Sequence, residues 1–180
     1  PASERRFLED TASLARTARA RTVSELRQLM SISDDLARLN RERFQAFDPD
    51  STDGVQAAFA FAGDVYEGLR ARELDVAGLA FAQDHVRILS GLYGLLRPLD
   101  RIQPYRLEMG TRLKTRRGSS LYDFWGDRIS KCLNAEVEGQ SDRTLVNLAS
   151  QEYFGAVDAR ALKLPVVTPH FREGKDGESR

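Results

Sequence analysis

The sequence TLVNLASQEYFGAVDARALKLPVVT, residues 144–168, carries the strand signals that decide the fold class. Its two ends, 144–148 and 164–168, are apolar and partly β-branched, which favours short β-strands. Ser150 lies between them and can cap the start of a helix, because its hydroxyl can accept a hydrogen bond from a backbone N–H of the first turn. Since the remainder of the chain has mainly helical patterns, we expect a mixed α/β class of the α+β type, helix-rich with a few strands and without regular βαβ alternation.

The clearest helix precedes this stretch and begins at Ser120, with one apolar face: Leu121, Phe124, Trp125, Ile129, Cys132 and Leu133. Three more helices are predicted in the N-terminal third. The first has apolar residues at helical spacing from Phe7 to Ala18, and the second begins with the capping-box pattern of Thr22 and Glu25. Ser33 can cap the third, which should end at Asp48-Pro49 and bury Leu36, Leu39, Phe44 and Phe47.

The centre of the chain is more ambiguous. Residues 57–62 form a continuous apolar run, which fits a buried helix and a buried strand equally well. Residues 79–89 are apolar over a wide arc, and this pattern predicts an interior helix. From all these segments the predicted core contains Phe44, Phe61, Val86, Leu89, Phe124, Trp125 and Leu148.

The composition limits the kinds of protein and of site that the chain can form. The chain has 180 residues, 41% of them hydrophobic and 30% charged, which is typical of a soluble globular protein and predicts one compact domain over 1–180. It has no apolar run of 18 residues, so we expect no membrane partner and a cytoplasmic location. One cysteine and the two distant histidines, His85 and His170, are too few for a usual zinc site, and direct iron binding is the weakest option. We expect no metal and no cofactor, and the oligomeric state stays open.

The charges are unevenly distributed although their formal sum is zero. Between Asp48 and Asp84, eight acidic residues stand against two arginines, whereas between Arg87 and Arg117 eight basic residues stand against two acidic ones. This asymmetry favours a bipolar surface with a basic region for a polyanion. Ordinary solvated faces are the alternative.

Five motifs give the chain a resemblance to a known family: GDVYEGL at 63–69, LSGLYGLLRPLD at 89–100, QPYRLEMG at 103–110, LYDFWGD at 121–127 and VNLASQEYF at 146–154. In this order and at these spacings they resemble the YaaA family. The resemblance implies a cytosolic protein induced by hydrogen peroxide, which limits the damage that free iron and peroxide do to DNA. It also implies duplex DNA as the partner, bound through a helix-hairpin-helix and a positive cleft. Both ends of the family pattern are absent, so we expect a YaaA-like domain truncated at both ends.

The resemblance directs attention to residues 90–94 as the hairpin, with 79–89 as the first helix and 95–102 as the second. Gly91 and Gly94 would let backbone N–H groups approach phosphates closely. Two features weaken this assignment, because the glycines are separated by two residues rather than one and Pro98 lies early in the second helix. A plain turn between packed elements is the alternative.

The strongest physical indication of a polyanion is the basic cluster of Arg112, Lys114, Arg116 and Arg117. If residues 107–116 are extended, the first three share one face. Such a stripe contacts phosphates without reading sequence, so we predict nonspecific duplex binding. A strand edge protected by charge is the alternative. The predicted DNA-binding residues are Gly91, Gly94, Arg97, Arg101, Arg106, Arg112, Lys114, Arg116 and Arg117.

The motifs hold more polar residues than nonspecific DNA binding requires, and these can instead line a pocket for a small anionic ligand, a phosphate or a carboxylate. Arg97 or Arg106 would clamp the anion, and Asp123 or Glu152 would accept a proton. Internal salt bridges and caps are the structural alternative. Because the sequence contains no Ser-His-Asp order, P-loop or nucleotide fingerprint, the enzyme interpretation is second to DNA binding, and whether the protein is an enzyme stays open.

Overall fold

The computed structural model describes residues 6–170 and the backbone of 174–175 and 178–179. Internal contacts group the chain into two compact units, Pro1–Trp125 and Gly126–Arg180, and each unit is described by itself. Helices and short strands occur together, so the predicted α+β class is confirmed. No helix in the described part of the chain is both long and apolar enough to cross a bilayer.

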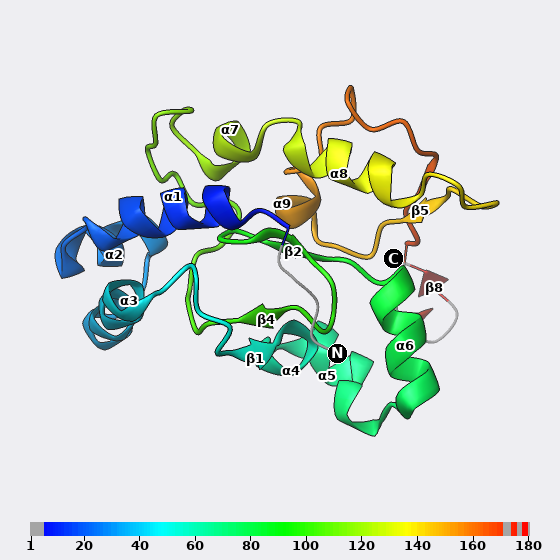
Figure 1. Cartoon of the computed structure of the whole chain (residues 1–180), viewed down its shortest axis with the longest axis horizontal. Coiled ribbons are helices and arrows are strands. Elements are labelled where there is room, and N and C mark those ends of the chain that lie inside the picture. The colour runs from blue at the N-terminus through cyan, green and yellow to red at the C-terminus, as the bar shows by residue number, and fades with distance from the viewer. Residues whose placement is uncertain (1–5, 171–173, 176–177, 180) are drawn as a thin grey trace. The chain divides into compact units, whose positions relative to one another are not determined.

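The first unit contains helices α1 to α7 and strands β1 to β4 (Figure 1). In chain order these are α1 (Leu8–Arg19), α2 (Val23–Met30), α3 (Asp34–Ala46), β1 (Val55–Gln56), α4 (Ala57–Ala60), α5 (Asp64–Leu69), a 3-10 turn (Ala71–Glu73), α6 (Val76–His85), β2 (Ile88–Ser90), β3 (Gly94–Leu96), β4 (Arg101–Ile102) and α7 (Leu121–Trp125).

Helices α2 and α3 begin where their caps predict. The Thr22 hydroxyl accepts from the Glu25 backbone N–H, and the Glu25 carboxylate accepts from the Thr22 N–H, which completes the capping box of α2. The Ser33 hydroxyl caps α3 in the same way. At the other end of α3, the Arg19 guanidinium of α1 donates to the backbone carbonyls of Phe44 and Phe47. Arg19 thereby satisfies carbonyls at the end of a helix, which have no partner within the helix itself.

The buried face of α3 differs from the predicted one. Phe44 and Phe47 are buried as expected, but Leu36 and Leu39 are exposed. The residues that face the core are Ala37, Asn40 and Phe44, which also follow helical spacing. Asn40 can occupy a buried position in this row because its side-chain amide forms hydrogen bonds with backbone groups inside the fold.

The predicted helix-hairpin-helix at 79–102 is wrong. After α6 ends at His85, the chain forms an antiparallel β-hairpin of β2 and β3, in which Leu89 faces Leu95. A side chain at Gly91 would place its Cβ 2.1 Å from the Leu107 carbonyl oxygen, and Gly94 (φ +71°) lies against the Trp125 ring. Both glycines are buried, so they serve close packing and cannot form a phosphate-binding turn in this unit.

The ambiguous run at 57–62 begins with a single helical turn, α4, directly after β1, which pairs antiparallel with β4.

Helix α6 is not interior, since Val76 and Phe81 are strongly exposed and Ala82 is its buried residue. Phe61, Val86 and Leu89 are half-buried rather than core. The largest fully buried side chains of this unit are those of Trp125, Tyr93, Phe44 and Phe124.

The long helix predicted from Ser120 is interrupted. Helix α7 ends at Trp125, Gly126 has a positive φ of 52°, and α8 (Arg128–Glu136) begins two residues later. Glycine adopts this left-handed backbone conformation without a steric penalty, and such residues commonly end helices. Phe124 and Trp125 are nevertheless buried as predicted.

The second unit confirms the strand–helix–strand prediction. It contains α8, β5 (Leu145–Val146), α9 (Gln151–Phe154) with Ser150 as its cap, β6 (Val166–Val167) and the pair β7 (Gly174–Lys175) and β8 (Glu178–Ser179). Strands β5 and β6 pair in parallel. The Asn134 side chain joins α8 to the following loop, because it donates to the Ala161 carbonyl and accepts from the Lys163 N–H. Leu148, predicted as core, is 67% exposed.

Candidate nucleic-acid interface

Residues 112–117, here called the basic segment, alternate between the core and the surface. Leu113 is buried, whereas Arg112, Lys114 and Arg116 are all exposed. The alternation extends back through Thr111, Met109 and Leu107, which are also buried. The alternation of burial is present but the expected strand is not, because residues 111–114 belong to no strand and Arg116 lies in a turn between the bridged residues Thr115 and Gly118.

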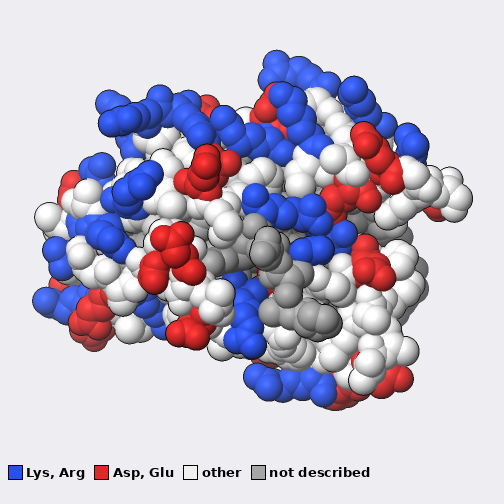
Figure 2. Space-filling model, viewed as in Figure 1, with Lys and Arg blue, Asp and Glu red and all other residues white. Residues whose placement is uncertain are grey.

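Figure 2 shows Lys and Arg side chains gathered over the loop that leads into α7, where the basic segment lies. Among the described residues, none forms an ion pair with Arg112, Lys114 or Arg116. A polyanion can therefore pair with these three cations without displacing a described acidic side chain.

Helix α3 fixes the backbone at Arg106, which precedes the basic segment. The Asn40 side-chain amide donates to the Arg106 carbonyl and accepts from the Arg106 N–H, each at 2.8 Å. Further along, the Leu121 N–H of α7 donates to the Thr111 carbonyl at 3.2 Å. These bonds and the buried side chains between them fix the backbone from which the cations extend.

A tight turn reverses the chain at the end of the basic segment, and Arg116 and Arg117 lie within it. The Thr115 N–H donates to the Gly118 carbonyl at 2.9 Å, and the turn brings Gly118 (φ +152°) against Asp123. A side chain at Gly118 would place its Cβ 2.2 Å from the Asp123 Cβ, so the turn requires glycine for space as well as for its conformation.

Asp123 is a helix cap. Its Oδ2 accepts from the backbone N–H groups and the hydroxyls of Ser119 and Ser120, and the Ser120 hydroxyl accepts in return from the Asp123 N–H. These bonds, that of the Ser120 hydroxyl first, hold the pKa of Asp123 below its usual value. A carboxylate that is stabilised as an anion is a poor proton acceptor, which argues against the predicted catalytic role.

Arg117 is held by two other elements. Its guanidinium forms an ion pair with the Asp10 carboxylate of α1 and lies over the Phe124 ring, 4.6 Å from the ring centre. Asp10 is far away in sequence, so this contact joins the basic segment to α1. Arg117 is thus partly committed within the protein, unlike the three cations before it.

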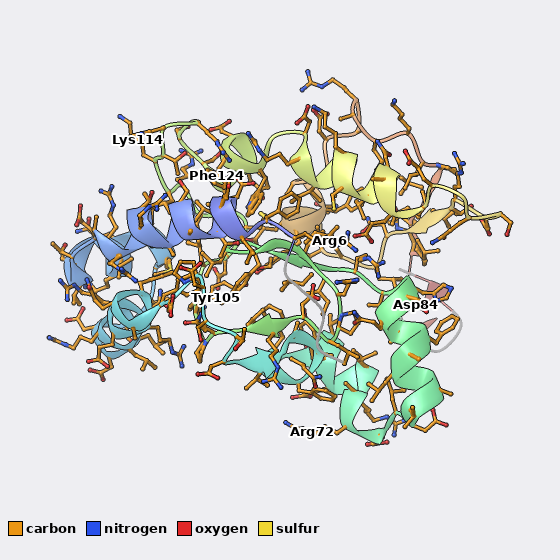
Figure 3. The ribbon with its side chains drawn as sticks, viewed as in Figure 1. Arg6, Arg72, Asp84, Tyr105, Lys114 and Phe124 are labelled. Carbon is orange, nitrogen blue, oxygen red and sulfur yellow. The ribbon has the colours of Figure 1, made fainter. Side chains whose placement is uncertain are left out.

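A pocket of about 540 Å³ opens between α1 and the basic segment. Among the described residues, its lining contains guanidinium groups and hydroxyls but no carboxylate: Ser13, Arg16, Thr17, Thr115, Arg116, Arg117 and Phe124. In Figure 3, Lys114 lies at the outer edge of the loop and Phe124 lies between α7 and α1. The sequence analysis missed the contribution of α1. Ser13, Arg16 and Thr17 share a helix face, but nothing in the local pattern indicates which distant segment that face meets.

The other predicted arginines have partners within the protein. Arg97 pairs with the fully buried Asp100, Arg106 pairs with Glu108, and Arg101 donates to the Gly54 carbonyl. None of these three lines the pocket beside α1. For Arg97 and Arg106 the internal salt bridges considered in the sequence analysis are present. Arg97 and Arg106 do not come together with Asp123 in this pocket.

Glu152, the remaining catalytic candidate, is exposed on α9 in the second unit. In the described part of the chain, no three His, Cys, Asp or Glu side chains are grouped so that they could hold a metal ion.

Comparison with known proteins places the chain in a family. The family model described as "Peroxide stress protein YaaA" matches residues 1–180. The chain belongs to the YaaA family. A UPF0246 protein of Phenylobacterium zucineum is 68% identical over 180 residues, which are 100% of this chain and 68% of the relative. A UPF0246 protein of Caulobacter vibrioides is 68% identical over 94% of this chain and 66% of its own length. A UPF0246 protein of Roseobacter denitrificans is 59% identical over 98% of this chain and 69% of its own.

The match confirms the resemblance read from the five motifs. The YaaA chain described here spans about two thirds of the length of these relatives. Of the predicted DNA-binding residues, the cations of the basic segment are exposed, whereas the hairpin glycines are buried.

Proposed function

We propose that this protein takes part in the response to peroxide stress by binding duplex DNA with little sequence preference. Membership of a family described as "Peroxide stress protein YaaA" supports the role in peroxide stress. DNA binding is supported by one observation: Arg112, Lys114 and Arg116 are close together in the chain, all exposed, and unpaired among the described residues.

The geometry favours phosphate contacts over base reading. Arg112 and Lys114 are two residues apart, so their Cα atoms lie at most roughly 7 Å from one another, and Arg116 follows in the turn at 116–117. Phosphates on one DNA strand recur at a comparable spacing, since one strand carries a charge about every 3.4 Å of helix axis along a longer, winding path. Contacts to phosphates carry no sequence information, so we expect affinity without sequence specificity.

Phosphate binding also gives a physical route to protection from iron. Duplex DNA concentrates cations around its phosphates, and a protein that neutralises phosphates releases those cations. Ferrous ions near DNA would be displaced in the same way, so peroxide would react with iron further from the bases. This route requires no iron site on the protein.

The test is a salt titration of duplex binding. Changing Arg112, Lys114 and Arg116 to Ser should flatten the slope of log affinity against log salt by about 2 to 3 units. Arg117 stays unchanged because its contacts with Asp10 and Phe124 also support the fold. The matched control changes three exposed cations of the second unit, Lys131, Arg143 and Lys163, to Ser and should alter the slope by less.

Both variants should keep the thermal stability of the parent, because exposed charges contribute little to it. Equal slopes for the parent and the first variant would show that the basic segment does not contact phosphate, and the proposal would fail.

A further inference from the structure

The pocket between α1 and the basic segment has features that duplex binding does not explain. A DNA backbone needs a row of surface cations, whereas this pocket is a concave volume of about 540 Å³ with three guanidinium groups around it. That volume lies within the range of small-molecule sites, about 300 to 1,000 Å³. We propose that the pocket binds a terminal phosphate group, a phosphate monoester, through Arg16, Arg116 and Arg117.

The donors of the lining suit a phosphate. Each guanidinium presents several N–H donors in a planar fork that matches phosphate oxygens. The side chains of Arg16, Arg116 and Ser13 form no hydrogen bond or ion pair with another described residue, so their donors are available to a ligand. Thr17 is already used in part, because its hydroxyl donates to the Ser13 carbonyl at 3.0 Å.

The charge balance favours a dianion. Three arginines line the pocket, and the Asp10 carboxylate that holds Arg117 offsets one of them. The remaining two positive charges match a phosphate monoester, which carries about −1.5 to −2 at pH 7. A backbone diester carries a single negative charge, so it matches the two remaining positive charges less well.

The Phe124 ring and the ion pair with Asp10 hold the Arg117 guanidinium in position to bind an anion. Arg117 is oriented between the Phe124 ring and Asp10, so little side-chain freedom is lost when it binds a ligand. Arg16 approaches from the opposite side, on α1. Since Arg16 lies outside the basic segment, it distinguishes this proposal from duplex binding.

The first experiment measures calorimetric binding of phenyl phosphate to the full chain at pH 7.5. Arg16→Ser should weaken binding roughly 10-fold to 100-fold, the usual effect of losing a charged hydrogen-bond donor. Arg38→Ser, an exposed arginine of α3 outside the pocket, is the control and should bind as the parent does. The affinity of the parent should fall between pH 7.5 and pH 5, because the second ionisation of a monoester has a pKa of about 6. Dimethyl phosphate, a diester, should bind weakly at both pH values.

The second experiment identifies the source of the phosphate. A duplex with 5′-phosphate ends is compared with the same duplex ending in 5′-hydroxyls. If DNA ends are the ligand, the parent should prefer the phosphorylated duplex, and Arg16→Ser should lose that preference. If free monoesters are the ligand, the parent should bind the two duplexes equally, and its binding of phenyl phosphate should still depend on Arg16.

Either result supports the pocket. The proposal is overturned if the parent does not bind phenyl phosphate, or if Arg16→Ser binds it within twofold of the parent. The salt slope measured with 5′-hydroxyl duplex tests the proposed function separately, because neither Arg16 nor a terminal phosphate enters that measurement.

Discussion

The side-chain amide of Asn40 forms hydrogen bonds to both backbone groups of Arg106, although 66 residues separate them in sequence. Asn40 is buried, so these bonds satisfy one donor and one acceptor that have no access to water. The contact fixes where the chain leaves the core before the basic segment begins.

Asn40→Ala should therefore destabilise the chain by about 2 kcal/mol, because it removes both part-buried hydrogen bonds to the Arg106 backbone. Urea unfolding followed by the fluorescence of the single, buried Trp125 measures the change. Gln28→Ala removes an exposed amide from α2 and should alter the free energy of unfolding by less than about 0.5 kcal/mol. Similar values for the two variants would mean that the Asn40 bonds contribute nothing beyond the helix itself.

Two glycine substitutions should have opposite effects. Gly91→Ala should cost about 3 kcal/mol, because its Cβ would lie 2.1 Å from the Leu107 carbonyl oxygen and backbone cannot easily shift. Gly68→Ala, in α5 with no atom near the added Cβ, should stabilise by about 0.5 to 1 kcal/mol because alanine favours helix. Thermal melts of both variants test this. A stable Gly91→Ala protein would contradict the packing of the β2–β3 hairpin.

Asp10→Asn should release Arg117 from its ion pair. The freed guanidinium can then neutralise one more phosphate, so the slope of log affinity against log salt should steepen by up to about 0.9 units. Asp34→Asn breaks a comparable ion pair with Arg27, away from the basic segment, and is the control. If the two variants change the slope equally, the added effect comes from net charge and not from Arg117.

The Asp123 cap predicts a dependence on pH. The folded-state pKa of Asp123 is lowered from 3.8 by the donors of Ser120 and Ser119, so its contribution to stability is fully present above the unfolded pKa. That contribution should be lost as the pH falls through the lower folded-state pKa. The difference in unfolding free energy between the parent and Asp123→Asn should therefore shrink as the pH is lowered from 6 towards 2.5. A difference between the parent and Asp123→Asn that stays constant with pH would refute the cap assignment.

Local signals predicted the helix starts well. Thr22 with Glu25, Ser33, Ser120 and Ser150 each accept the backbone hydrogen bond expected of a cap. These bonds join residues three apart, so a short stretch of sequence contains all of the information required. The alternation that exposes Arg112, Lys114 and Arg116 was predicted for the same reason, because burial of every second residue follows from an extended backbone.

Signals that depend on distant partners failed. The apolar run before Ser90 was interpreted as one helix and a phosphate-binding hairpin, but its second half pairs with residues 94–96 as a strand. Leu36, Leu39 and Leu148 were expected in the core, yet all three are exposed. Hydrophobicity indicates that a residue can be buried, and only the packing of the chain decides which face of an element is covered.

The sequence by itself determined the α+β class, the family, the helix caps and the identity of the exposed cations, since each rests on local patterns or on motifs that are contiguous in the chain. Tertiary structure decided that Gly91 and Gly94 are buried by Leu107 and Trp125, that Asn40 fixes Arg106, and that Arg16 of α1 faces the same pocket as Arg116 and Arg117. Each of these depends on two segments that lie far apart in sequence. Such segments meet only when the apolar side chains between them are removed from water. The hydrophobic effect is non-directional, so the local sequence does not indicate which segments will meet.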